Sequence, residues 1–168
     1  MSKLKTIKIE KITVNMGVGE SGEELKKAIK ILKKITGKKP VQTLCKVKAP
    51  TLNIRPGLPI GAKVTLRGND SIEFLKKVLA AKENVLQKKN FDRNGNFGFG
   101  IKEYIDIPNV KYEPELGIRG FDVLVALERP GYRIKRRKIG KVKVGKGQCV
   151  SREDAMAFIK DTFGVEIE

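Results

Sequence analysis

Three glycines near the N-terminus have a spacing that could cradle a phosphate group. Gly17, Gly19 and Gly22 match the pattern G-x-G-x-x-G, between a predicted strand and a predicted helix. In dinucleotide-binding enzymes this loop admits the pyrophosphate, and an acidic residue about 20 positions later holds the ribose. Here residues 26–69 contain no acid, and the preceding strand alternates polar with apolar residues where a central parallel strand would be continuously apolar. We favour a flexible strand-to-helix turn; the alternative is a nucleotide-dependent enzyme.

A second group of side chains suits contact with RNA. Lys63, Thr65 and Arg67 are predicted to project from one face of a strand, with Asn15 on a neighbouring strand. Their ammonium, hydroxyl, guanidinium and carboxamide groups can bind phosphates, 2′-hydroxyls and base edges. The composition alone supports an ordinary solvated sheet face equally well.

The charge of the chain favours a polyanionic partner. The 168 residues include 36 Lys and Arg against 19 Asp and Glu, a net charge of +17, and no histidine. Residues 26–69 hold 12 basic residues and residues 129–152 hold ten more, in both cases without an acid. Phosphate contacts release condensed counterions, so such blocks favour a polyanion over a basic surface that serves only solubility. The lack of histidine disfavours acid–base catalysis and metal binding.

The remaining composition excludes several other classes of protein. Cys45 and Cys149 are isolated, so the sequence predicts neither a disulfide framework nor a CxxC metal site, and it favours a reducing, cytosolic compartment. No apolar run approaches the roughly 20 residues that span a bilayer. We therefore expect no membrane contact, no cofactor and no metal.

Three helices are predicted from a polar cap followed three residues later by a carboxylate. They open at Ser21, Asp70 and Ser151. The residues with helical spacing that we expect to be buried are Leu25, Ala28, Ile29, Leu32 and Ile35 in the first, Leu75, Val78, Leu79 and Val85 or Leu86 in the second, and Ala155, Phe158, Ile159 and Phe163 in the third.

Apolar residues that alternate with polar ones predict the strands. The strands are expected at residues 12–16, 41–45, 60–66, 97–101 and 121–127, with a further strand at 132–136 that forms a hairpin through Pro130 and Gly131. Residues 46–59 and 88–96 are predicted to be long exposed loops. The pattern predicts an α+β fold: an antiparallel sheet with helices packed on one side and long basic loops.

Two further segments have both an RNA-binding and a structural interpretation. Residues 96–104 (NFGFGIKEY) are faintly similar to the aromatic strand of RNA-recognition sheets, but Phe97 and Phe99 on one strand face favour a place in the core. Residues 133–148 interleave Lys and Arg with apolar residues. We favour an extension that contacts a polyanion over a solvated hairpin.

Five blocks of sequence stand in the order and spacing of one known family. They are KITVNMGVGE (residues 11–20), GKKPV (37–41), IRPGLPIGAKVTLRG (54–68), FDRNGNFGFGIKE (91–103) and GIRGFDV (117–123). Over nearly its whole length the chain therefore resembles the family of universal large-subunit ribosomal protein five. The start close to the first strand and the basic insertion before the last helix are similar to the archaeal type.

The resemblance implies a single ribosomal protein domain over residues 1–168, with a basic insertion at about 129–148 and a C-terminal helix at 151–163. It implies a cytoplasmic, ribosome-bound structural protein, not an enzyme, that binds 5S rRNA and helps to attach it in the central protuberance. Its implied partners are 5S rRNA, large-subunit rRNA, peptidyl-site tRNA, other central-protuberance proteins and, across an intersubunit bridge, a small-subunit head protein of the S-thirteen type. A free-standing regulatory RNA-binding module is the alternative.

The resemblance also implies roles for particular residues. The expected rRNA-binding residues are Asn15, Lys38, Lys63, Thr65 and Arg67, and bacterial members commonly have Gln at the position of Lys38. The loop at residues 46–59 is expected to face tRNA through Lys46, Lys48 and Arg55. In the basic extension the candidate residues are Arg133, Lys135, Arg136, Arg137, Lys138 and Lys141.

Overall fold

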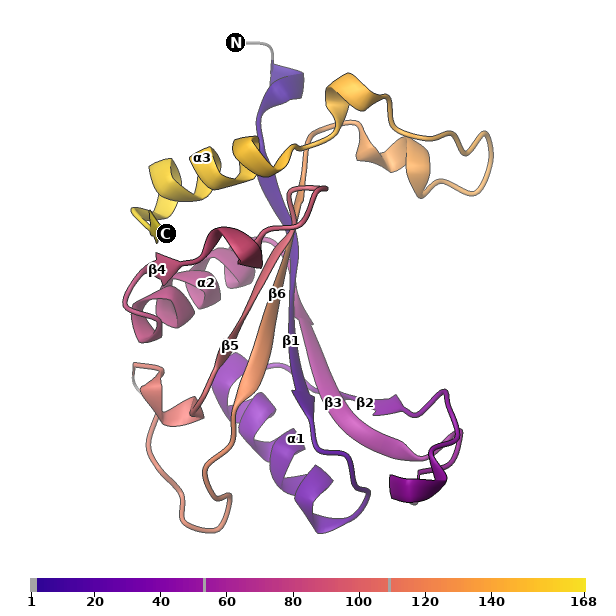
Figure 1. Cartoon of the computed structure of the whole chain (residues 1–168), viewed down its shortest axis with the longest axis vertical. Helices are drawn as coiled ribbons and strands as arrows, with labels where there is room; N and C mark the ends of the chain where they lie inside the picture. The colour runs from indigo at the N-terminus through magenta and orange to yellow at the C-terminus, as the bar shows by residue number, and fades with distance from the viewer. Residues whose placement is uncertain (1–2, 53, 109) are drawn as a thin grey trace. The chain divides into compact units, whose positions relative to one another are not determined.

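The computed structural model describes residues 3–52, 54–108 and 110–168. In these ranges three α-helices accompany a five-stranded antiparallel sheet, of strand order β2-β3-β1-β6-β5, and a separate parallel pair, β4 and β7 (Figure 1). The predicted α+β class is confirmed. The elements are β1 Lys8–Gly17, α1 Glu23–Thr36, β2 Val41–Leu44, β3 Pro59–Leu66, α2 Asn69–Ala81, β4 Val85–Leu86, β5 Phe97–Ile101, β6 Phe121–Glu128, α3 Arg152–Phe163 and β7 Glu166–Ile167.

The chain divides into two compact units. The α1 unit contains residues 13–66 and 99–124, and the α2–α3 unit contains residues up to 12 together with 67–98 and 125–168. Strands β1, β5 and β6 contribute residues to both units. The single domain expected over residues 1–168 stays a prediction.

Strict alternation along the long strands buries one face of the sheet. The buried residues include Ile12, Val14 and Met16 of β1, Ala62, Val64 and Leu66 of β3, and Phe121, Val123, Val125 and Leu127 of β6. Burial of each of the larger side chains in this set contributes about 1.5–3 kcal/mol relative to exposure. A register slip of one residue would turn the whole apolar set toward water, so the pattern specifies the pairing.

Phe97 and Phe99 of β5 are core residues, 3% and 6% exposed. Phe97 stacks on Phe91 with ring centroids 5.1 Å apart. The core interpretation of the aromatic strand is confirmed, and neither ring offers a surface on which an RNA base could stack.

Within the α1 unit, helix α1 packs against β3. Leu25, Ala28, Ile31 and Leu32 are buried, whereas Ile29 is half-buried. At about 100° per residue, positions 29 and 31 lie equally far from the middle of the arc between Ala28 and Leu32. Spacing could not separate them, and packing against β3 selects Ile31. Three other residues predicted to be buried are half-buried and lie at the margins of their helix faces: Ile35, Phe158 and Phe163.

The predicted cap is present at the start of α3 but not at the other two helices. Ser151 Oγ accepts a hydrogen bond from the Asp154 N–H (3.1 Å), and the Asp154 carboxylate accepts one from the Ser151 N–H (3.3 Å). Helices α1 and α2 begin instead after Gly22 (φ 122°) and Gly68 (φ 65°), and a glycine at the N-cap has no side chain that could cap the helix. The starts predicted at Ser21 and Asp70 are therefore wrong, because glycine conformations that other residues rarely adopt turn the chain into both helices.

Val85 and Leu86 belong to β4, so their assignment to the second helix is wrong. Glu83 and Asn84 both have a φ of 57°, which ends the helical path after Ala81. Strand β4 pairs in parallel with β7, with Val85 opposite Glu166. Two-residue strands carry no periodicity, so no sequence pattern indicated this pair.

The strand predicted at residues 132–136 is also wrong. Tyr132–Lys135 forms a 3₁₀ helix after Gly131, which has a φ of 98°. The Tyr132 hydroxyl accepts from the Val150 N–H (2.9 Å) and donates to the Gln148 carbonyl (3.2 Å). These two bonds tie the tight turn to the chain before α3, so it does not run on as a hairpin strand.

Candidate RNA-binding surfaces

The open side of the sheet in the α1 unit carries three of the predicted RNA-binding residues. Lys63 and Thr65 are exposed, between the buried residues of β3, and Asn15 is half-buried on β1, the strand next to β3. Each lies on the strand face opposite the buried residues, so the three side chains share one surface. We call Asn15, Lys63 and Thr65, with Thr43 of β2, the open sheet face.

Thr43 is a member of this face that sequence reasoning missed. It pairs with Gly61, and its Oγ1 would lie 2.8 Å from a Cβ added there, with the Met16 carbonyl oxygen at 2.9 Å. Because residue 61 has no side chain, the Thr43 hydroxyl can lie close to the backbone of β3. Only the register of β2 on β3 shows this, and the sequence does not specify that register.

Lys38 and Arg67 flank the open sheet face along the chain. Lys38 is exposed in the turn after α1, three residues before Val41, which pairs with Lys63. The Lys38 amide donates to Thr36 Oγ1 at 3.4 Å. Arg67 is exposed directly after β3 and belongs to the α2–α3 unit.

The segment predicted as a loop at residues 46–59 is a narrow hairpin that extends β2 and β3. The Cys45 N–H donates to the Leu58 carbonyl (2.8 Å), and Ala49 and Ile54 exchange both backbone hydrogen bonds (3.0 and 3.1 Å). Lys46, Lys48 and Arg55 are all exposed on it. One residue of the hairpin, 53, lies outside the described residues. The sequence identified the positive charges of this segment but did not predict the backbone hydrogen bonds that pair its two arms.

The basic extension is attached to the α2–α3 unit by its own arginines. Arg136 lies 2.9 Å from the Glu10 carboxylate of β1 and 2.6 Å from the Glu128 carboxylate of β6. These carboxylates are only 12% and 16% exposed, so the guanidinium compensates two nearly buried negative charges. Arg136 therefore has a structural role, and its predicted contact with a polyanion stays a prediction.

Some of the other predicted residues of the extension also make contacts within the protein, and the rest are exposed. Arg137 Nε donates to the Gly140 carbonyl at 2.6 Å and closes a turn, while the Lys135 ammonium lies 4.5 Å from the centre of the Tyr132 ring. The remaining predicted residues are exposed and offer their charge outward: Arg133, Lys138 and Lys141.

Arg129 anchors the end of the extension to α3. Its guanidinium lies 2.8 Å from Asp154 and donates to the Cys149 carbonyl at 3.2 Å. Burial disfavours the charged form of Asp154, but the hydrogen bonds from Ser151 and the charge of Arg129 outweigh it and lower the pKa of this carboxyl. Burial raises the pKa of Tyr132, so its hydroxyl keeps the proton that it donates.

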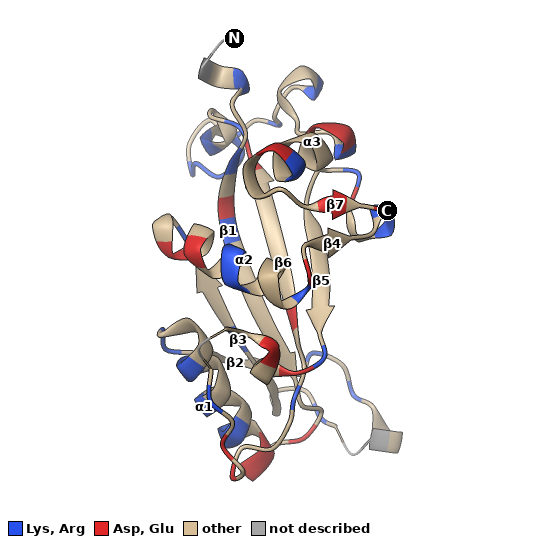
Figure 2. Cartoon of the chain, turned by 90° about the vertical axis from the view of Figure 1, so that its left-hand side faces the viewer, with Lys and Arg blue, Asp and Glu red and all other residues tan. Residues whose placement is uncertain are grey.

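Helix α1 carries a basic stripe that we did not single out from the sequence. Lys26, Lys30 and Lys33 are exposed at helical spacing, and Figure 2 shows the blue segments along this helix. Two other lysines of the helix pair with acids, Lys27 with Glu24 (2.9 Å) and Lys34 with Glu113 (2.7 Å). The helical spacing of these lysines was the available signal.

The glycine motif does not form a phosphate cradle. Gly17 ends β1, and the helix start after Gly22 carries Glu23 and Glu24, whose charges oppose a bound phosphate. Glu24 forms ion pairs with Lys27 and Arg119. Among the described residues we also find no cluster of potential metal ligands and no helix long and apolar enough to cross a membrane.

Comparison with known proteins places similarity along almost the whole chain. Residues 2–55 match the family model described as ribosomal protein L5, and residues 59–158 match the model of the C-terminus of the same ribosomal family. The chain is 50% identical to large ribosomal subunit protein uL5 of Nanoarchaeum equitans, over 98% of this chain and 97% of the relative. It is 49% identical to uL5 of Methanococcus aeolicus (96% and 91%) and 46% identical to uL5 of Sulfurisphaera tokodaii (99% and 95%).

Proposed function

The chain belongs to the ribosomal protein L5 family, and from this premise we propose that it binds 5S rRNA and helps to attach that RNA to the large ribosomal subunit. Membership makes the chain a structural constituent of the large subunit, ribosome-bound in the cytoplasm, and not an enzyme. The archaeal relatives agree with the archaeal type that the sequence resembles.

The observation that carries the proposal is the open sheet face. Helix α1 packs on one face of β3, and Lys63 and Thr65 project from the opposite face. Asn15 projects from the same face of the neighbouring strand β1. A rigid strand fixes the spacing of these donors, which suits recognition of one RNA shape better than general attraction does. Lys38, just before β2, and Arg67, just after β3, add positive charge at the two ends of this β2–β3 segment.

The finer placement is part of the same proposal. The protein lies in the central protuberance with 5S rRNA, large-subunit rRNA and other proteins of that region. The hairpin with Lys46, Lys48 and Arg55 contacts peptidyl-site tRNA, which its exposed charge and closed backbone support. Residues of the second half of the chain bridge to a small-subunit head protein of the S-thirteen type.

The test measures the affinity of the full chain for 5S rRNA when one side chain is removed. Lys63→Ala, Thr65→Val and Arg67→Ala should each weaken binding, by on the order of 1–3 kcal/mol where the contact is well formed. Lys76→Ala is the matched control, because Lys76 is an exposed lysine of α2 and is none of the predicted contact residues. Losses as large for Lys76→Ala as for Lys63→Ala would refute recognition by the open sheet face.

A further inference from the structure

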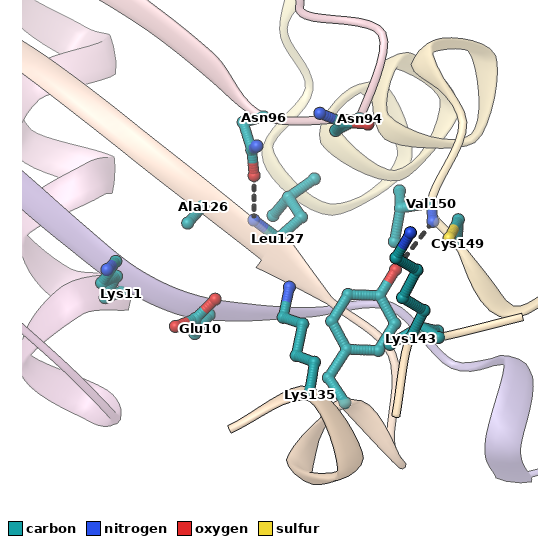
Figure 3. A pocket seen from close by; sticks show the side chains of 12 residues that line it. Glu10, Lys11, Asn94, Asn96, Ala126, Leu127, Lys135, Lys143, Cys149 and Val150 are labelled. Atoms are coloured by element: carbon teal, nitrogen blue, oxygen red, sulfur yellow. Dashed lines mark hydrogen bonds between the residues drawn. The ribbon is translucent and has the colours of Figure 1, made fainter. Parts of the chain in front are cut away.

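An open cavity of about 540 Å³ lies in the α2–α3 unit, between the sheet and the basic extension (Figure 3). One wall comes from β1 and β6, and the other from the extension and the chain that leads into α3. Its volume is within the range of about 300–1,000 Å³ that is usual for small-molecule sites. None of the functions proposed above uses it.

The rim of the cavity is cationic. Lys11, Lys135 and Lys143 line it, and one carboxylate, that of Glu10, accompanies them. Arg136 pairs with Glu10 at 2.9 Å, so this carboxylate is already neutralised by a residue outside the lining. The field in the cavity therefore favours an anion, and lysine ammonium groups bind phosphate as point charges.

The walls are apolar and held in place. Leu127, Val150 and Tyr132 are 2%, 2% and 7% exposed and form the closed floor of the cavity, where two bonds of the Tyr132 hydroxyl fix the ring. Ala126 and Val144 are half-buried and offer its accessible apolar surface. Lys135 lies over the ring, 4.5 Å from its centre. A flat heteroaromatic group would find both apolar contact and cations here, a combination that inorganic phosphate does not exploit.

Two carboxamides complete the lining. Asn94 and Asn96 flank Gly95, where an added Cβ would lie 2.6 Å from Val150 Cγ1, so this turn is packed directly on the wall. Asn96 Oδ1 accepts from the Leu127 N–H at 3.3 Å, which orients that side chain (Figure 3). Carboxamide groups pair with the donor and acceptor edges of nucleobases.

From these features we propose that the cavity binds one unstacked nucleotide. The base lies against Ala126 and Val144, above the closed floor at Tyr132 and within reach of the asparagines, and the phosphate lies at Lys135 and Lys143. The nucleotide is either free or an extruded residue of the bound RNA, and only the second source rests on the proposed function. The cavity is then a second point of attachment, apart from the open sheet face.

The two cysteines of the chain provide a direct readout. Cys149 is exposed and lines the cavity, whereas Cys45 lies elsewhere, so a Cys45→Ser protein reports through Cys149 alone. The rate of Cys149 alkylation by iodoacetamide is measured against increasing AMP, GMP, CMP or UMP. At least one mononucleotide should protect the thiol at a concentration about tenfold lower than inorganic phosphate does. The proposal would be overturned if inorganic phosphate protected Cys149 as well as the mononucleotides do, or if no mononucleotide gave protection that saturates.

Charge-matched variants locate the ligand. Lys143→Gln and Lys135→Gln should each weaken protection by about tenfold, and Lys138→Gln, in the same extension but outside the lining, should change it less than twofold. Asn94→Ala should change the ranking of the four nucleotides. Lys143→Gln decides the outcome if Lys135→Gln alters folding, since Lys135 also contacts Tyr132. Equal effects of Lys143→Gln and Lys138→Gln would contradict the site.

A parallel measurement with 5S rRNA separates this proposal from the proposed function. Protection of Cys149 by bound 5S rRNA, sensitive to Lys143→Gln, identifies an RNA nucleotide as the occupant. Protection by mononucleotides alone identifies a free nucleotide. If 5S rRNA binds and no ligand protects Cys149, the cavity proposal fails and the proposed function stands. If 5S rRNA does not bind, the proposed function fails, and the mononucleotide titration still decides the cavity.

Discussion

Arg136 shows how a cation of the basic extension can stabilise the fold. Its guanidinium lies between Glu10 and Glu128, and Lys8 adds a second cation 3.6 Å from Glu128. Removal of Arg136 would leave two carboxylates with little access to water and incomplete compensation. Its role is to hold the basic extension against β1 and β6.

We expect Arg136→Ala to lower the free energy of unfolding by about 1–2 kcal/mol, a value reduced from that of a buried pair because the arginine is itself partly exposed. Lys138→Ala, which removes the same charge from an exposed site, should change it by less than about 0.5 kcal/mol. Urea denaturation of both variants makes the comparison. Equal stabilities would show that the ion pairs do not hold the extension.

Asp154 gives the stability a dependence on acid pH. Its pKa is lowered in the folded chain, so its contribution is complete above the unfolded pKa of about 3.9 and is lost as pH falls through the lower folded value. At pH 7, Asp154→Asn should cost about 0.5–1 kcal/mol of unfolding free energy, a modest value because the side chain is 43% exposed. The cost should be smaller at a pH below the unfolded pKa than at pH 7, and it should shrink further as pH falls through the lower folded value.

Urea titrations of wild type and Asp154→Asn at pH 7 and pH 3 test this expectation. Asp161→Asn, an exposed position on the same helix, is the control. A stability difference between wild type and Asp154→Asn that stays constant across this pH range would contradict it.

At the scale of residues, the sequence predicts which strand side chains are exposed better than it predicts which groups the arginines contact. Alternation alone placed Lys63 and Thr65 outside and Val64 and Leu66 inside, because a strand has a period of two. Nothing local distinguishes Arg136 from Arg133, since the carboxylates that pair with Arg136 come from strands far away in the sequence. Charge counts identify a cation but not its partner.

At the scale of elements, the pairing of β2 with β3 depends on Gly61. A methyl group there would meet Thr43 Oγ1 at 2.8 Å and the Met16 carbonyl oxygen at 2.9 Å. The hydroxyl could rotate away, but the backbone oxygen belongs to β1 and cannot move without distorting the sheet. The open sheet face is therefore built on a position that admits no side chain.

Gly61→Ala should destabilise the protein by about 1–3 kcal/mol, as overpacking does, and should weaken 5S rRNA binding as well. Gly17→Ala is a matched control, because it also changes a strand glycine and the added methyl group would have open space. Thermal unfolding and an RNA titration of both variants provide the measurement. If the Gly61→Ala protein were as stable as the Gly17→Ala protein, β1 and β2 would have to shift enough to accommodate the methyl group.

The sequence predicts long periodic elements and misses short ones. The 3.6-residue period located α1, α2 and α3, and alternation located the five strands of the large sheet. The β4–β7 pair and the 3₁₀ turn at Tyr132 depend on backbone angles at Glu83, Asn84 and Gly131 and on bonds to distant residues. Such features have no repeat for a pattern to detect.

At the scale of the whole molecule, a net charge of +17 supplies attraction without selectivity. Exposed lysines such as Lys141 contribute to this attraction through released counterions. Lys141→Ala should therefore reduce the slope of log affinity against log salt by about one and weaken binding to all RNAs alike. Titrations at several salt concentrations check this; a loss confined to 5S rRNA would assign Lys141 to specific recognition instead.

The central claim is that this chain selects 5S rRNA, and a competition titration tests it most directly. The full chain, bound to labelled 5S rRNA at about 0.15 M salt, is challenged with unlabelled 5S rRNA, tRNA or random duplex RNA. We predict that 5S rRNA competes at least about tenfold better than either of the others, a difference of about 1.4 kcal/mol. A preference below tenfold would contradict the claim for the isolated protein.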